Sequence, residues 1–288
     1  MCANDAANGE MDDDTAPGGS DVAGIFNRVA GGYDKEVLRF FAFAADCLVM
    51  NAGIRSGDKV LDVATGTGAA ALAAAQVVGP AGRVVAIDTA ELMLERAQAK
   101  VQKFGVANID LHVMDARQLE FRSGYFDAVI CSQSLFLLPD MQAAIRGWAR
   151  VVKPGGVIAF SSFAAAAFQP MATLLRRRVA DLAGPDFGSV QELPLQRLAT
   201  SDRCLQLLQH AGLVQCEVMQ QQLGYHLGDA EQWWEVVCNS GFRGLIDQLQ
   251  PAQFEILRKQ HLQDVRPLVG ADGLWMDVGT LCSRAHKP

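Results

Sequence analysis

The chain has 288 residues, half of them apolar, and a formal net charge of −7 from 25 basic and 32 acidic residues. This length allows one large or two small domains with a substantial core. The basic residues are scattered apart from the run at 176–178, which argues against nucleic acid as a partner, because a surface that follows nucleic acid needs a basic stripe.

Residues 1–23 are acidic and glycine-rich, and they lack the basic and apolar regions of a signal peptide. We expect them to be a disordered leader before a single domain over 24–288. No apolar stretch reaches about 18 residues without a charge, glycine or proline, so no membrane span is predicted. The seven cysteines form no CxxC pair, which favours reduced thiols, a cytoplasmic location and no metal site.

Strand and helix patterns alternate between residues 60 and 161. The expected strands are 60–63, 83–87, 109–113, 126–131 and 157–161, and the expected helices are 68–78, 90–104 and 140–152. This alternation indicates βαβ units around a parallel sheet that is covered on both faces. The sequence therefore predicts an α/β fold with a Rossmann-like, doubly wound sheet.

The alternation breaks after residue 162. Two further strands are expected at 213–227 and 274–282, and helices at 171–182, 201–211, 230–249 and 251–265. The helical insertion between the two strands is about 45 residues long, a length more typical of functional caps than of plain connections. We place cap insertions near 163–210 and 229–270.

A glycine turn follows the first predicted strand. Gly66 and Gly68, with alanines behind them, satisfy G-x-G-x-x-A between a strand and a helix, which is a nucleotide-binding fingerprint. Asp62 lies four residues before Gly66, at the end of the strand. A pyrophosphate at the turn would be repelled by this carboxylate, whereas the ammonium and sulfonium of S-adenosylmethionine would be attracted to it. The acid therefore favours S-adenosylmethionine over a pyridine dinucleotide.

Two more strands end in an aspartate. Asp88 follows Gly68 by 20 residues, where a carboxylate accepts both ribose hydroxyls of either cofactor. Asp115 closes the third strand, where it can accept a hydrogen bond from an adenine amino group. Single acids of this kind often cap the next helix, but three in succession favour a nucleoside site.

These residues carry a resemblance to a known family. The segments FNRVAGGYD, LDVATGTG, VVAID, DAR, FDAVICSQSLFLLPD and VVKPGG occur in order over about residues 24–162. This region resembles the class I S-adenosylmethionine-dependent methyltransferases, in particular the ubiquinone/menaquinone-biosynthesis group. The resemblance implies a sheet of seven strands whose last strand is antiparallel, with 213–227 as strand six and 274–282 as strand seven.

The resemblance also implies roles for individual residues. Asp62 would hold the methionine amino group, Asp88 would bind the ribose, and Tyr33 would close over the methyl donor. The methionine and ribose would lie along Ala64, Gly66 and Gly68. The adenine would contact Thr89, Met93, Asp115 and Ala116, and the transferred methyl would lie near Ser132 and Gln133.

The acceptor half offers weaker signals. Of the five histidines, His226 at the end of strand six is the candidate base, with Tyr33 as a second catalytic candidate. The arginines at 176–178, Arg243 and Arg266 could instead bind an acidic acceptor. Trp233 or Trp234 could line an apolar pocket with Phe163, Phe168 and Met171, or both could be ordinary core.

We therefore predict methyl transfer from S-adenosylmethionine to a small, hydrophobic metabolite, by C- or O-methylation of a group such as a carboxylate or hydroxyl. Two alternatives stay open. One is an NAD(P)-dependent oxidoreductase, which Asp62 and Asp115 disfavour. The other is a non-catalytic S-adenosylmethionine-binding protein. The sequence indicates neither the acceptor atom nor the oligomeric state.

Overall fold

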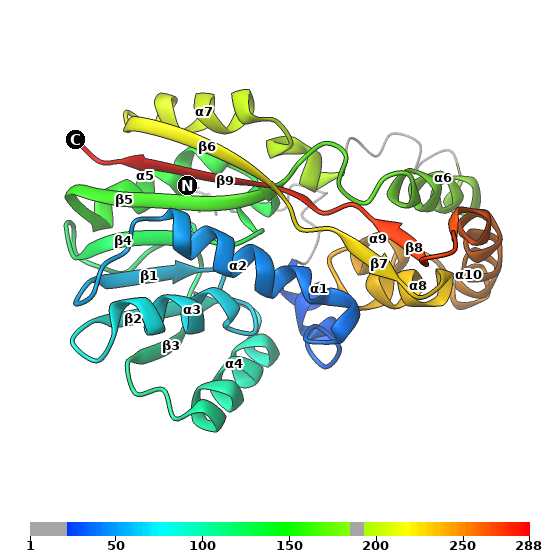
Figure 1. Ribbon diagram of the computed structural model, residues 1–288, viewed down its shortest axis with the longest axis horizontal. Coiled ribbons are helices and arrows are strands. Elements are labelled where there is room, and N and C mark those ends of the chain that lie inside the picture. Colours follow the sequence, from blue (N-terminus) through cyan, green and yellow to red (C-terminus); the bar gives the residue numbers. More distant parts are fainter. Residues whose placement is uncertain (1–21, 185–192) are drawn as a thin grey trace, which may run out of the picture.

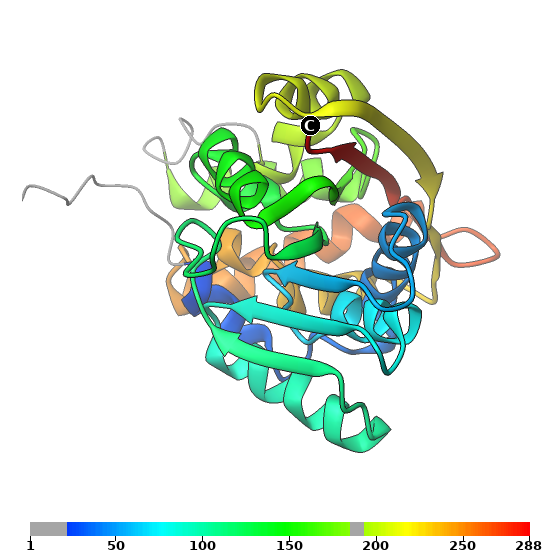
Figure 2. The same ribbon diagram turned by 90° about the vertical axis from the view of Figure 1, so that its left-hand side faces the viewer.

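The structure is a computed structural model that describes residues 22–184 and 193–288 (Figures 1 and 2). The leader predicted for residues 1–23 lies outside this range except for Val22 and Ala23, which begin helix α1 (Val22–Val29). The centre of the molecule is a seven-stranded sheet in the order β3-β2-β1-β4-β5-β9-β6. Its strands are β1 (Lys59–Val63), β2 (Arg83–Asp88), β3 (Ile109–Val113), β4 (Phe126–Cys131), β5 (Val152–Phe163), β6 (Val214–Gln222) and β9 (Gly279–His286).

The first five strands run parallel, and the last strand does not. β9 lies between β5 and β6 and is antiparallel to both. The predicted seven-stranded sheet with an antiparallel last strand is thus confirmed. Because β1 to β5 are parallel, their carboxyl ends meet at one edge of the sheet, beside α1 in Figure 1.

Helices cover both faces of the sheet because side chains alternate along each strand. Val60 packs in the cluster that contains Leu48 and Ala74, whereas Leu61 packs in the cluster of Trp148 on the other face. The helices around the sheet are α2 (Phe40–Asn51), α3 (Ala69–Val78), α4 (Glu91–Phe104), α5 (Met141–Val151) and α7 (Ser201–His210). α7 lies within the predicted cap at 163–210, but it packs against β6 and so covers the sheet.

A helical lobe lies beyond the carboxyl ends of the parallel strands (right side of Figure 1). It consists of α6 (Met171–Ala183), α8 (Ala230–Asn239), α9 (Arg243–Ile246) and α10 (Pro251–Val265). α6 packs against α10 although about 70 residues separate them in the sequence. Among the described helices, none combines the length and apolar character needed to cross a bilayer.

Two predicted strands are each divided in the structure. The strand predicted at 213–227 breaks after Gln222, and its end forms β7 (Tyr225–Leu227), which pairs with β8 (Leu274–Met276) in a separate two-stranded ribbon. The strand predicted at 274–282 likewise becomes β8 and β9. The break lies at Gly224, where an added Cβ would come within 2.7 Å of the Met276 carbonyl oxygen, so only glycine allows the crossing.

Two further boundaries differ from the predictions. The helix predicted at 230–249 is divided into α8 and α9, because α8 ends at Asn239 and Ser240 is extended. The strand predicted at 157–161 extends over the whole of β5 and includes the Lys-Pro-Gly-Gly segment. Short one-turn helices complete the chain at Glu36–Leu38, Leu135–Leu137, Pro194–Leu198 and Arg266–Leu268.

Candidate active site

The glycine turn joins β1 to α3 in a backbone conformation that favours glycine. Ala64, Gly66 and Gly68 have φ angles of 55°, 56° and 84°. The backbone N–H of Gly66 donates to Asp88 Oδ2 at 2.8 Å, which ties the turn to the end of β2. Gly68 serves helix packing, because a Cβ there would lie 3.1 Å from the Cβ of Ala97 in α4.

Asp62 is fully buried at the end of β1. Its Oδ2 accepts a hydrogen bond from Thr65 Oγ1 at 2.6 Å, whereas its Oδ1 is buried without a partner among the described residues. Burial, with a smaller contribution from the neighbouring Asp88 carboxylate, raises the pKa of Asp62 to about 7, although the Thr65 hydrogen bond lowers it. An unpaired buried carboxylate of this kind is suited to a cationic ligand.

Asp88 and Asp115 differ in their surroundings. Asp88 accepts backbone hydrogen bonds from Gly66 and Ala90, and burial raises its pKa. Each of its oxygens keeps a lone pair for a further donor. Asp115 is paired with Arg117, whose side chain holds the pKa of this carboxyl below its usual range.

An acid-lined cavity of about 280 Å³ opens at these strand ends. Most of the predicted binding residues line it, and they comprise Tyr33, Asp62, Ala64, Gly66, Asp88, Thr89, Met93, Asp115, Ala116 and Ser132. Two predicted residues do not. Gly68 lies behind the turn, and Gln133 lines a second cavity instead.

The N-terminal segment closes one side of the acid-lined cavity. The Tyr33 ring stacks on Phe41 with the centroids 4.4 Å apart and meets the edge of Phe26. Burial raises the pKa of the Tyr33 phenol above its usual range, and the carboxylates of Asp88 and Asp34 add to this, so the phenol stays protonated.

Three polar side chains that the sequence analysis missed hold this segment in place. Thr67 Oγ1 donates to Asp34 Oδ1 at 2.8 Å, and Lys100 Nζ donates to both of these residues. The contact joins α4, the glycine turn and the N-terminal segment, which are far apart in the sequence. The spacing of Asp34, Thr67 and Lys100 in the sequence does not indicate that they meet, although Asp34 and Thr67 lie inside the quoted motifs.

A second cavity, of about 260 Å³, adjoins the first. We call it the aromatic cavity, because seven phenylalanines line it: Phe26, Phe40, Phe41, Phe136, Phe163, Phe168 and Phe242. The two cavities share Val22, Phe26, Tyr33, Phe41 and Leu137, so helix α1 and Tyr33 lie between them.

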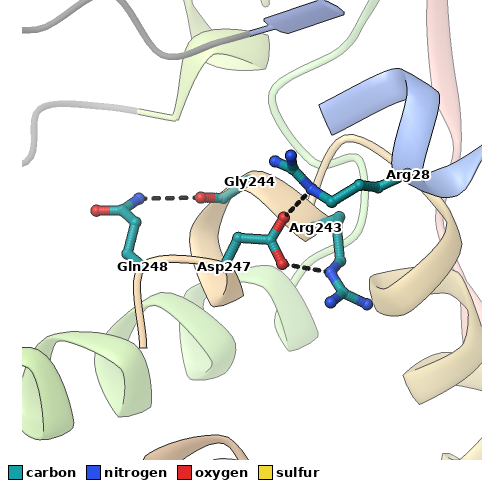
Figure 3. Close-up of polar contacts among 5 residues, drawn as sticks. All are labelled: Arg28, Arg243, Gly244, Asp247 and Gln248. Carbon is teal, nitrogen blue, oxygen red and sulfur yellow. Dashed lines mark hydrogen bonds and ion pairs between the residues drawn. The ribbon is translucent and has the colours of Figure 1, made fainter. Parts of the chain in front are cut away.

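An ion-pair cluster fastens α1 to the helical lobe (Figure 3). Asp247 accepts hydrogen bonds from Arg28 Nε of α1 at 2.8 Å and from Arg243 Nε of α9 at 2.5 Å. The adjacent Gln248 side chain donates to the Gly244 carbonyl at 3.0 Å, and both residues line the aromatic cavity. α1 is thereby held over both cavities from the outside.

The structure does not bring His226 to either cavity. Its exposed ring packs against Trp275 in the β7–β8 ribbon, with the centroids 5.1 Å apart, because β7 has left the main sheet. The prediction of His226 as a base therefore has no geometric support. Tyr33 is the catalytic candidate that does line the site.

The candidate acceptor residues separate into two groups. Phe163 and Phe168 line the aromatic cavity, whereas Met171 and both tryptophans pack elsewhere. Trp233 Nε1 donates to the buried His261 at 2.8 Å, as part of the lobe core. Three of the five arginines proposed for an acidic acceptor form ion pairs: Arg178 with Asp264, Arg243 with Asp247, and Arg266 with Glu231.

Comparison with known proteins agrees with this geometry. Residues 60–156 match a family described as a methyltransferase domain. A ubiquinone/menaquinone biosynthesis C-methyltransferase, UbiE, of Cronobacter sakazakii is 32% identical over 188 residues, which cover 60% of this chain and 73% of the relative. The chain belongs to the class I S-adenosylmethionine-dependent methyltransferases. This membership does not support the alternative of an NAD(P)-dependent oxidoreductase.

Other methyltransferases share less of their length with the chain. Nocamycin O-methyltransferase of Saccharothrix syringae is 37% identical over 134 residues, which are 46% of this chain and 48% of that protein. A UbiE of Pasteurella multocida is matched over 59% of its length. The chain thus spans about half to three-fifths of the length of these curated relatives.

Solved structures share the methyltransferase fold of the chain. The [4+2]-cyclase SpnF superposes with a TM-score of 0.61 at 20% identity, over 95% of this chain and 98% of SpnF. The YcgJ protein of Bacillus subtilis superposes with a TM-score of 0.56 at 18% identity, over 85% of this chain and 98% of YcgJ. At such identities the likeness extends to the fold alone.

Proposed function

We propose that the protein transfers a methyl group from S-adenosylmethionine to a small, hydrophobic metabolite by C- or O-methylation, for example of a carboxylate or hydroxyl. The observation that carries the proposal is the pair of adjoining cavities, one lined by acids and the other by phenylalanines, with Tyr33 between them. A cationic nucleoside suits the first cavity and an apolar acceptor suits the second.

The residues of the acid-lined cavity fit the cofactor. The unpartnered Oδ1 of Asp62 offers a buried acceptor for the methionine ammonium, and Asp88 keeps lone pairs for the ribose hydroxyls. The buried Met93 and Ala116 offer apolar contact for an adenine, and Asp115 an acceptor for its amino group. When bound, the cofactor supplies a methyl carbon that its sulfonium activates.

The contribution of the chain is to bind, align and exclude water. Apolar side chains surround the acceptor position, and the protonated Tyr33 phenol lies where the cavities meet. The proposal places the protein in the cytoplasm, and the free thiols of Cys131, Cys204, Cys216 and Cys238 fit a reducing compartment.

The test is transfer of labelled methyl from S-adenosylmethionine into a small-molecule extract of the host. We expect label in a low-mass, extractable product whose mass rises by one methylene unit. Label in protein or RNA but in no metabolite would contradict the proposal. Binding of S-adenosylhomocysteine without any labelled product would favour the non-catalytic alternative, and heat of binding with NADH alone would favour the oxidoreductase.

A further inference from the structure

The described lining of the aromatic cavity contains no base. Its described lining contains no aspartate, glutamate, histidine, lysine or arginine, and Tyr33, its one ionisable side chain, is protonated. Among these described residues, a neutral alcohol or amine acceptor would therefore find no group that takes its proton. An acceptor that ionises in water before binding has no such need.

Gln133 is the unusual polar residue of this cavity. It follows β4 with a φ angle of 54°, a left-handed conformation that non-glycine residues adopt mainly where the surroundings enforce it. The Ser161 side chain and carbonyl fix it, since both accept from the Gln133 backbone N–H, at 3.1 and 3.2 Å.

The Gln133 side chain has no such partners. It is only 5% exposed, and neither its Nε2 nor its Oε1 forms a hydrogen bond within the described residues. Buried amides are nearly always paired, so an unpaired one that lines a cavity is a candidate contact for a ligand. The neighbouring Ser132 lines the acid-lined cavity, so Gln133 lies close to where the two cavities adjoin.

We propose that Gln133 binds the carbonyl oxygen of the acceptor, and that the acceptor is a flat, conjugated enol made acidic by that carbonyl. This inference rests on the proposed function. The phenylalanine lining suits a planar ring system. The enol loses its proton to water, and the resulting anion is stabilised by the adjacent sulfonium charge and by the Gln133 N–H. The anion then forms a bond to the methyl carbon, while the electron pair of the broken bond stays on sulfur.

The test uses 4-hydroxycoumarin, an acidic enol with a conjugated carbonyl, and 1-naphthol, a neutral ring system of similar size. Binding is measured by calorimetry on the protein saturated with one of two cofactor analogues. Sinefungin carries an amine near the position of the sulfonium and transfers no methyl, whereas S-adenosylhomocysteine has no positive charge at its sulfur. We expect 4-hydroxycoumarin to bind the sinefungin complex at least tenfold more tightly than the S-adenosylhomocysteine complex. The affinity for 1-naphthol should be the same in both complexes within about threefold.

Gln133→Met removes the amide at nearly constant volume. We expect this substitution to lower the affinity for 4-hydroxycoumarin at least tenfold, while the affinities for 1-naphthol and for S-adenosylhomocysteine change less than threefold. Gln142→Met is the matched control, because Gln142 also has a buried, unpaired Nε2 but lines neither cavity. It should change none of these affinities.

Three results would overturn the inference. The first is failure of 4-hydroxycoumarin to bind the sinefungin complex, and the second is equal affinity for 4-hydroxycoumarin in the two cofactor complexes. The third is an equal loss of affinity for 4-hydroxycoumarin and 1-naphthol in Gln133→Met. Failure of S-adenosylhomocysteine itself to bind would instead refute the proposed function, so the two failures are distinguishable.

Discussion

Replacing Asp62 by asparagine should change cofactor affinity and protein stability in opposite directions. The side chain is fully buried, and burial raises its pKa to about 7. Asparagine keeps the shape and the Thr65 contact but removes the charge. The variant therefore loses its attraction for the methionine ammonium, and the unliganded protein no longer carries a buried carboxylate without a cation.

The magnitudes follow from burial and pairing. A hydrogen bond to a charged group contributes about 1.5–3 kcal/mol, which corresponds to about a 10- to 150-fold higher Kd for S-adenosylhomocysteine. For stability, a raised carboxyl pKa means that the folded state holds its proton more tightly than the unfolded state. Asp62 thus costs the folded state stability progressively as pH rises from about 4 to about 7, and the full cost is present above pH 7. About three pH units at about 1.4 kcal/mol each limit the gain in Asp62→Asn to about 4 kcal/mol.

Calorimetry and thermal unfolding measure the two effects. Methylthioadenosine, which lacks the amino-acid group, should bind the variant and the wild type equally. Affinity of the wild type for S-adenosylhomocysteine should fall as pH drops below about 7, whereas that of Asp62→Asn should stay flat. Asp140→Asn, which retains the cap of α5, is the control. Unchanged S-adenosylhomocysteine affinity together with weaker methylthioadenosine binding would refute the reasoning.

Three further predictions concern the turn, the ion-pair cluster and the lobe. Gly66→Ala should lower the unfolding free energy by about 1–2 kcal/mol, because alanine is strained at a φ of 56°, and it should also weaken the binding of S-adenosylhomocysteine. Gly105 has a similar φ but lies away from the cavity, so Gly105→Ala should lower stability alone. Asp247→Asn should change the unfolding free energy by less than about 1 kcal/mol. It should nevertheless raise the dissociation rate of S-adenosylhomocysteine measured by stopped flow, because α1 loses its ion pair with α9. An unchanged dissociation rate would contradict this. Burial lowers the pKa of His261 to about 4, so stability in urea titrations should fall as pH drops from about 6.5 towards 4, and an identical pH profile in His261→Gln would reject this assignment.

The sequence was sufficient to predict the cofactor half of the molecule, for a physical reason. Buried parallel strands are short apolar runs, and the residue that ends each run reaches the common edge of the sheet. Asp62, Asp88 and Asp115 therefore had to lie near one another. Asp34 and Lys100 were missed because their contact depends on how the turn after α1 is placed against α4.

The acceptor half could not be predicted in the same way. The alternating pattern over 213–227 has the same period whether the chain stays in one sheet or crosses into another, so it could not indicate the break at Gly224. His226 was misplaced for this reason. Ser132 and Gln133 were treated as one site, but as neighbours at a strand end they point into different cavities.

The β7–β8 ribbon brings together the two ends of the segment 228–273. Residues 228–273 leave and re-enter through two paired strands, so the ends of this segment lie about one strand spacing, ~4.8 Å, apart. A segment of different length or composition can be grafted between these two strands without changing the register of β1, β2 or β3. Evolution, or a protein engineer, can therefore exchange this wall of the aromatic cavity while the acid-lined cavity stays as it is.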